Sequence, residues 1–191
     1  MKNKTPLLLL ALISSPALAH SDASGSGFMS GVTHPIFGLD HLLAMLSIGI
    51  LSAQLGGRSI WQLPTTFVLV MVIGGVLGML QVPMLPIELG IALSVLVLGA
   101  GIALDRNLSS RLAIAFAALF AVFHGYAHGL EMPSMASPAS YIAGFIIGTT
   151  AIHIIGVFIG VFSTQCNTRR KALRGLGASI MFSGVYFLAG A

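Results

Sequence analysis

Three side chains that can bind metal ions fall on one face of a predicted helix. His124, His128 and Glu131 follow one another at intervals of four and three residues, and at about 100° per residue they project in nearly the same direction. Two imidazoles four residues apart on a helix can bind one divalent ion together. Glu131 adds an oxygen ligand and a negative charge. The spacing predicts a metal-binding face; the alternative is two histidines that only form hydrogen bonds with neighbouring helices.

A second group of the same chemistry lies near the N-terminus. Pro35 suits the first position of a helix, so we expect His34 to lie just outside the helix as a cap residue. His41 is seven residues further on, on roughly the same face as His34. Asp40 can bind a metal directly, or accept the ring proton of a histidine and so fix which nitrogen faces the metal. Capping alone explains His34 but not the Asp40–His41 pair.

Three further residues are candidates for additional metal-binding positions. Glu88 stands at the start of an apolar stretch, where it is either a helix-start carboxylate or part of a site. His153 lies near the middle of another stretch, as a deeper relay or as a hydrogen-bonded core histidine. His20 can bind a metal with its α-amine only if the chain is cleaved just before it.

The composition identifies an integral membrane protein. Of 191 residues, 56% are apolar and 7% are charged, whereas a soluble domain carries about 25% charged residues. The nine Lys/Arg residues, for a net charge of +4, are too few to neutralise a run of nucleic-acid phosphates. The single cysteine excludes a disulfide framework and a thiolate metal cluster within one chain.

Residues 1–19 have the pattern of a cleaved signal peptide. Lys2 and Lys4 precede a short apolar run, and Ala17-Leu18-Ala19 matches a cleavage signal. The apolar run is shorter than the roughly 20 residues that span a membrane, although an uncleaved anchor is the alternative. We therefore expect a mature chain of residues 20–191 that forms one domain.

Six apolar stretches in that domain predict an all-α bundle of six transmembrane helices, because helices satisfy their own backbone hydrogen bonds in lipid. Four pairs of glycines at i and i+4 predict close helix packing: Gly74/Gly78, Gly125/Gly129, Gly144/Gly148 and Gly156/Gly160. The predicted spans are 35–55, 60–80, 86–104, 112–131, 140–162 and 176–189.

The basic residues predict the orientation of the bundle. If the mature N-terminus is outside, the inner loops hold all seven Lys/Arg residues of the mature chain, as the positive-inside rule requires. Both termini then face outward, and the two histidine motifs and Glu88 all fall in the outer half of the membrane. These basic residues are Arg58, Arg106, Arg111, Arg169, Arg170, Lys171 and Arg174.

The two motifs together resemble the signatures of the HupE/UreJ family of nickel/cobalt permeases, and the likeness extends over the whole chain. The resemblance implies secondary uptake of Ni²⁺, or of Co²⁺ in some members, often for the maturation of hydrogenase or urease. It also implies functional roles for His34, Asp40, His41, His124, His128 and Glu131. The motifs read His34-Pro35-x-x-Gly38-x-Asp40-His41 and Phe123-His124-Gly125-x-Ala127-His128-Gly129-x-Glu131.

The chemistry agrees with a permease of the bacterial inner membrane. Imidazole and carboxylate ligands suit Ni²⁺, Co²⁺ and Zn²⁺, and the sequence has no G-x-x-x-x-G-K-[ST] motif for ATP hydrolysis. The ion is expected as transported substrate and not as a permanently bound cofactor, with the lipid bilayer and the maturation proteins of a nickel enzyme as partners. The alternatives are an intramembrane metal-dependent hydrolase with a His/Asp zinc site and a bis-histidine haem protein.

Overall fold

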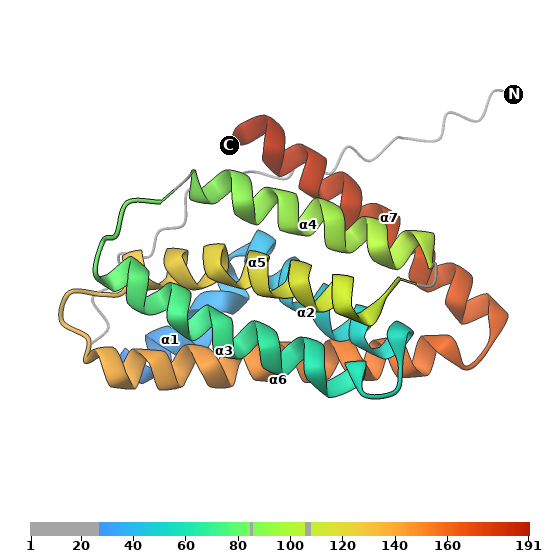
Figure 1. The fold of residues 1–191 in the computed structure, drawn as a ribbon, viewed down its shortest axis with the longest axis horizontal. Helices are drawn as coiled ribbons and strands as arrows, with labels where there is room; N and C mark the ends of the chain where they lie inside the picture. The colour runs from blue at the N-terminus through green and yellow to red at the C-terminus, as the bar shows by residue number, and fades with distance from the viewer. Residues whose placement is uncertain (1–26, 85, 106–107) are drawn as a thin grey trace, which may run out of the picture.

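A computed structural model of the chain describes residues 27–84, 86–105 and 108–191. Its regular elements in that part of the chain are seven α-helices (Figure 1). The expected signal peptide and His20 lie outside the described residues. The helices are α1 (Gly27–Phe37), α2 (Leu39–Leu55), α3 (Ser59–Met79), α4 (Ile87–Leu104), α5 (Ser110–Leu130), α6 (Pro138–Thr164) and α7 (Asn167–Gly190).

The all-helical, multi-span prediction is confirmed. Five helices, α3 to α7, are each long and apolar enough to cross a membrane. The helices α1 and α2 meet at an angle of 81° and together form a sixth span if the bent pair is counted as one. The count of six therefore stays a prediction that depends on this pair. The last helix begins at Asn167 and not at 176, because its basic first turns remain helical although they are too polar for the hydrocarbon core.

The predicted start of the first span is wrong. His34 and Pro35 lie inside α1 instead of capping a continuous helix. The break comes at Gly38, whose backbone is extended (φ −80°, ψ 107°) before α2 begins. A proline near the end of a helix weakens its hydrogen bonding, and close contact with α6 stabilises α1 despite its short length.

Paired glycines bring the helices into close contact, as the sequence predicts. Gly74 and Gly78 of α3 lie against the backbone of α5, and Gly125 and Gly129 of α5 lie against the backbone of α3. The other two predicted pairs, both on α6, contact α1 and α2 in the same way. These contacts leave α2 in the middle of the bundle, where it touches each of the other described helices.

A methyl group at one of these glycines should destabilise the bundle. In Gly125→Ala the new Cβ would overlap the backbone of Met71, so we expect a loss of about 1–3 kcal/mol in the free energy of unfolding. Gly175→Ala is the matched control, because a Cβ there meets nothing within 4 Å. Thermal unfolding in detergent measures both, and equal midpoints for the two variants would contradict the proposed α3–α5 contact.

The basic residues that the structure describes gather at one end of the bundle. The α2–α3 and α6–α7 connections lie at the right in Figure 1, at the same end of the bundle as the end of α4 and the start of α5. There Asp105, at the end of α4, accepts hydrogen bonds from Arg170 of α7, and Arg174 donates to the carbonyl of Ala103 at 2.9 Å. Two of the described basic residues, Arg170 and Arg174, thus join α7 to α4 at the end that the charge pattern assigns to the inside.

Candidate metal site

Four histidine side chains from three helices gather in one place. The ring centroid of His128 lies 4.9 Å from those of both His34 and His41, and His41 lies 4.8 Å from His124. His124 and His128 are fully buried. The structure therefore brings together the two motifs that lie about ninety residues apart in the sequence. We name His34, His41, His124 and His128 the histidine cluster.

Two faces of α5 contact different helices. Gly125 and Gly129 each follow a histidine by one residue, so they point about 100° away from it. The glycines lie against α3, which leaves the histidine face directed toward α1 and α2. Close packing of α3 on α5 thus fixes the direction of both imidazoles.

The bend between α1 and α2 places the other two histidines. His34 lies near the end of α1 and His41 in the first turn of α2. The 81° bend at Gly38 leaves their ring centroids 6.3 Å apart. The two residues meet across a bend, whereas the sequence predicted one face of a straight helix.

Each motif supplies a carboxylate that contacts a histidine. His34 Nε2 lies 2.7 Å from Glu131 Oε2, and His41 Nδ1 lies 2.9 Å from Asp40 Oδ1. Glu131 lies just beyond the end of α5. When Asp40 accepts the Nδ1 proton of His41, the lone pair remains on Nε2. Asp40 thus orients His41, one of the two roles predicted for it.

Several imidazole nitrogens in the cluster are buried without a protein partner. They are His41 Nε2, His124 Nδ1 and both ring nitrogens of His128. Ser94 of α4, which sequence reasoning missed, donates its hydroxyl proton to the carbonyl of Ile91 and lies 2.8 Å from His124 Nε2. The Nε2 proton of His124 is then directed at Ser94, and its Nδ1 carries the lone pair.

These lone pairs are of the kind that binds metal ions, but the side chains that carry them are not arranged to hold an ion. In the described part of the chain, no group of three or more His, Cys, Asp or Glu side chains is set to hold a metal ion as it stands. The carboxylates instead contact the imidazoles, and rotation of these side chains would be needed to surround an ion. The roles of the six motif residues as metal ligands therefore stay predictions.

Aromatic side chains surround the cluster, and nothing in their sequence spacing indicated it. Phe145 of α6 stacks on His128 with ring centroids 5.4 Å apart, and Tyr141 lies 6.3 Å from His34. Phe67 of α3 lies 5.6 Å from His124. This surround excludes water from the fully buried imidazoles of His124 and His128, which strengthens any charge interaction there.

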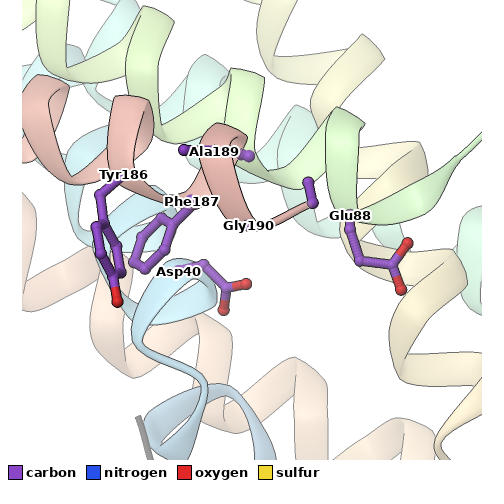
Figure 2. Close-up of a pocket in the computed structure, with 8 residues that line it drawn as sticks. Asp40, Glu88, Tyr186, Phe187, Ala189 and Gly190 are labelled. Carbon is purple, nitrogen blue, oxygen red and sulfur yellow. The ribbon is translucent and has the colours of Figure 1, made fainter. Parts of the chain in front are cut away.

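A cavity of about 550 Å³ lies beside Asp40 and is otherwise lined by residues of α4 and of the C-terminal end of the chain. Asp40 and Glu88 both line it, together with Phe187 and Tyr186 near the end of α7 (Figure 2). Glu88 lies in the first turn of α4, so it is a helix-start carboxylate and also faces a cavity. Asp40 contacts His41 and borders the same cavity, which makes it the link between the cavity and the cluster.

His153 lies apart from the cluster. It is buried in α6 and contacts Phe67, with ring centroids 5.3 Å apart. Neither of its ring nitrogens has a hydrogen-bond partner among the described residues. Its role in the pathway therefore stays a prediction.

Comparison with known proteins gives one consistent result. Residues 8–187 match the protein family described as HupE / UreJ protein. Protein HupE of Rhizobium leguminosarum bv. viciae is 34% identical over 193 residues, and the alignment covers all of both chains. No solved structure matches the chain.

Proposed function

Because the chain belongs to the HupE/UreJ family, a family of membrane transporters associated with nickel and cobalt uptake, we propose that it imports Ni²⁺ without ATP hydrolysis. Co²⁺ is the second candidate substrate. The imported metal would supply the maturation of an enzyme such as hydrogenase or urease. The alternative of an intramembrane hydrolase is not favoured by membership of a transporter family.

The observation that carries this proposal is the histidine cluster with its two carboxylates. Three of its imidazoles have buried nitrogens with no protein partner, and burying such groups without a partner is costly. A borderline divalent ion is the ligand that imidazole and carboxylate donors suit. A site of this chemistry within apolar helices is expected to lie on an ion pathway.

The route that these contacts support begins at the cavity beside Asp40 and Glu88. The two carboxylates attract the hydrated cation. Asp40 borders the cavity and also contacts His41, so the ion passes beside Asp40 to reach His41. Neutral imidazoles of the histidine cluster then replace water around the ion, while Asp40 and Glu131 offset its charge. A divalent cation that moves inward across 100 mV gains about 4.6 kcal/mol, so the membrane potential alone can drive uptake.

The orientation that suits this route is the one the charge pattern predicts. The basic connections face the cytoplasm, both mature termini face the periplasm, and the membrane is the bacterial inner membrane. The histidine cluster then lies in the outer half of the bilayer, where it meets ions that arrive from outside.

Uptake of radiolabelled nickel by cells that lack their own nickel importers tests the proposal. Cells that carry the protein should take up nickel well above the empty-vector level, and unlabelled cobalt should compete more effectively than zinc. Uptake at the empty-vector level, from protein shown to be in the membrane, would overturn the proposal.

Acidic medium should weaken uptake. Only neutral imidazole binds a metal ion, and protonation at low pH converts its lone pair into an N–H. Uptake should therefore be full near neutral pH and fall as the medium is acidified. Initial rates in proteoliposomes with a fixed membrane potential measure it, and an uptake rate that rises on acidification would contradict neutral histidine ligands.

A further inference from the structure

Ser94 is a fully buried hydroxyl residue that joins α4 to the histidine cluster. Its Oγ lies 2.6 Å from the carbonyl oxygen of Ile91, three residues earlier on α4, and 2.8 Å from Nε2 of His124 on α5. A hydroxyl group has one proton to donate and two lone pairs that accept. Because the carbonyl oxygen can only accept, both contacts are hydrogen bonds when Ser94 donates to Ile91 and accepts the Nε2 proton of His124.

The packing of α4 on α5 holds this serine beside the imidazole. Gly90 lies one turn before Ser94 on α4, and Phe123 directly precedes His124 on α5. A Cβ at Gly90 would lie 2.2 Å from the ring of Phe123. The absence of a side chain at Gly90 therefore lets the Phe123 ring pack against α4, next to the contact between Ser94 and His124.

The other ring nitrogen of His124 is the one that remains for a ligand. His124 Nδ1 is buried and has no hydrogen-bond partner among the described residues. A neutral imidazole carries a proton on one nitrogen and a lone pair on the other. A proton on Nε2, held by Ser94, therefore leaves the lone pair of Nδ1 free to bind an ion.

His41 has the reverse arrangement. Asp40 lies 2.9 Å from Nδ1 of His41, and Nε2 of this ring is buried without a partner among the described residues. The rings of His41 and His124 are neighbours, with centroids 4.8 Å apart and an angle of 83° between their planes. One acceptor for each ring thus leaves a free lone pair on Nε2 of His41 and on Nδ1 of His124.

We propose that Ser94 is a positioning residue of nickel transport, whose hydroxyl accepts the Nε2 proton of His124 and so makes Nδ1 the nitrogen that binds the ion. This proposal rests on the proposed transport function. Groups that hold the second nitrogen of a metal-binding histidine typically contribute about 10–100-fold to metal affinity or activity. Ser94 does for His124 what Asp40 does for His41, with a neutral acceptor in place of a charged one.

The first test measures nickel uptake as a function of nickel concentration. Ser94→Ala removes the acceptor of the Nε2 proton, so the half-saturating nickel concentration should rise by about tenfold or more, while the maximum rate per protein in the membrane changes less. Loss of packing alone would lower the amount of folded protein and leave the half-saturating concentration unchanged. An unchanged half-saturating concentration in Ser94→Ala would overturn the proposal.

Ser52→Ala is the matched control for this test. Ser52 of α2 is as fully buried as Ser94, and its hydroxyl also donates to the carbonyl three residues earlier, that of Gly49, at 2.7 Å. It has no imidazole partner among the described residues. The control should therefore keep the wild-type half-saturating concentration, and an equal rise in both serine variants would also overturn the proposal.

The second test locates the proton in the metal-free protein and does not require a Ser94 variant to fold. Two-bond ¹H–¹⁵N correlations of the imidazole rings at neutral pH distinguish a proton on Nε2 from one on Nδ1. The signals that disappear in His124→Gln identify His124. The wild type should carry this proton on Nε2. A proton on Nδ1 would mean that Ser94 donates to the ring, and this result would overturn the proposal.

The outcomes separate the role of Ser94 from the transport function itself. If the wild type takes up no nickel, the proposed function fails and the positioning role fails with it. If the wild type takes up nickel and Ser94→Ala has the same half-saturating concentration, the transport function stands and the role of Ser94 does not.

Discussion

Replacing His128 with alanine is expected to remove nearly all nickel uptake. His128 contacts the rings of both His34 and His41, and it is fully buried with both ring nitrogens unpartnered. Loss of groups that only orient metal ligands typically costs 10–100-fold in metal affinity or activity, so the loss of a central ligand should cost about a hundredfold or more. Initial rates of radiolabelled nickel uptake, corrected for the amount of protein in the membrane, measure the effect.

Tyr126→Phe is the control on the same helix. Tyr126 donates its hydroxyl to the carbonyl of Val82 at 2.6 Å, so this variant loses one hydrogen bond remote from the cluster and should transport nickel at nearly the wild-type rate. A His128→Ala variant as active as Tyr126→Phe would show that His128 is not a ligand on the pathway.

The second large effect is expected from Asp40→Asn. The asparagine keeps an oxygen that can accept the proton of His41 Nδ1, but it removes the negative charge beside that ring and beside the cavity. His41 then becomes a weaker ligand and the charge of the ion is less well offset. Uptake at low nickel concentration should fall by about 10–100-fold, and raised nickel should restore part of it.

Asp105→Asn provides the same chemical change at the other end of the bundle. Asp105 pairs with Arg170 near the basic connections, away from the histidine cluster and from the cavity beside Asp40. Its uptake curve should match that of the wild type. Equal curves for Asp40→Asn and the wild type would exclude a role of the Asp40 charge in ion capture.

Much of this site could be predicted from helix geometry. The period of 3.6 residues places His124, His128 and Glu131 together on α5, and the spacing of glycines identifies the faces that meet other helices. Charge patterning indicates which connections share an end of the bundle. Each of these predictions depends on residues close together in the sequence, whose relative positions a regular helix fixes.

The contacts between helices could not be predicted in this way. The bend at Gly38 depends on how α1 packs against α6, and residues 35–55 alone do not indicate this contact. Their sequence therefore predicted one straight helix. Ser94, Phe67 and Phe145 reach the histidines from other helices, and no local spacing identifies an apolar or hydroxyl residue as a neighbour of a particular imidazole. The same holds for the cavity that joins Asp40 to Glu88.

The number of transmembrane spans also depends on contacts between helices and not only on local sequence. A length and hydropathy criterion finds α3 to α7 one at a time, but α2 has only 17 residues and qualifies only together with α1. Yet α2 is the helix that contacts all the others. A short helix surrounded by neighbours does not need the full length of a lipid-exposed span, because other helices cover it.

The most direct measurement is X-ray absorption at the nickel edge of the purified protein loaded with Ni²⁺. Binding in the histidine cluster predicts nitrogen and oxygen ligands with the outer-shell scattering of at least two imidazoles, no sulfur ligand, and a reduced imidazole signal in His128→Ala. Bound nickel without imidazole scattering, or a spectrum identical in wild type and His128→Ala, would contradict the assignment of the ion to this cluster.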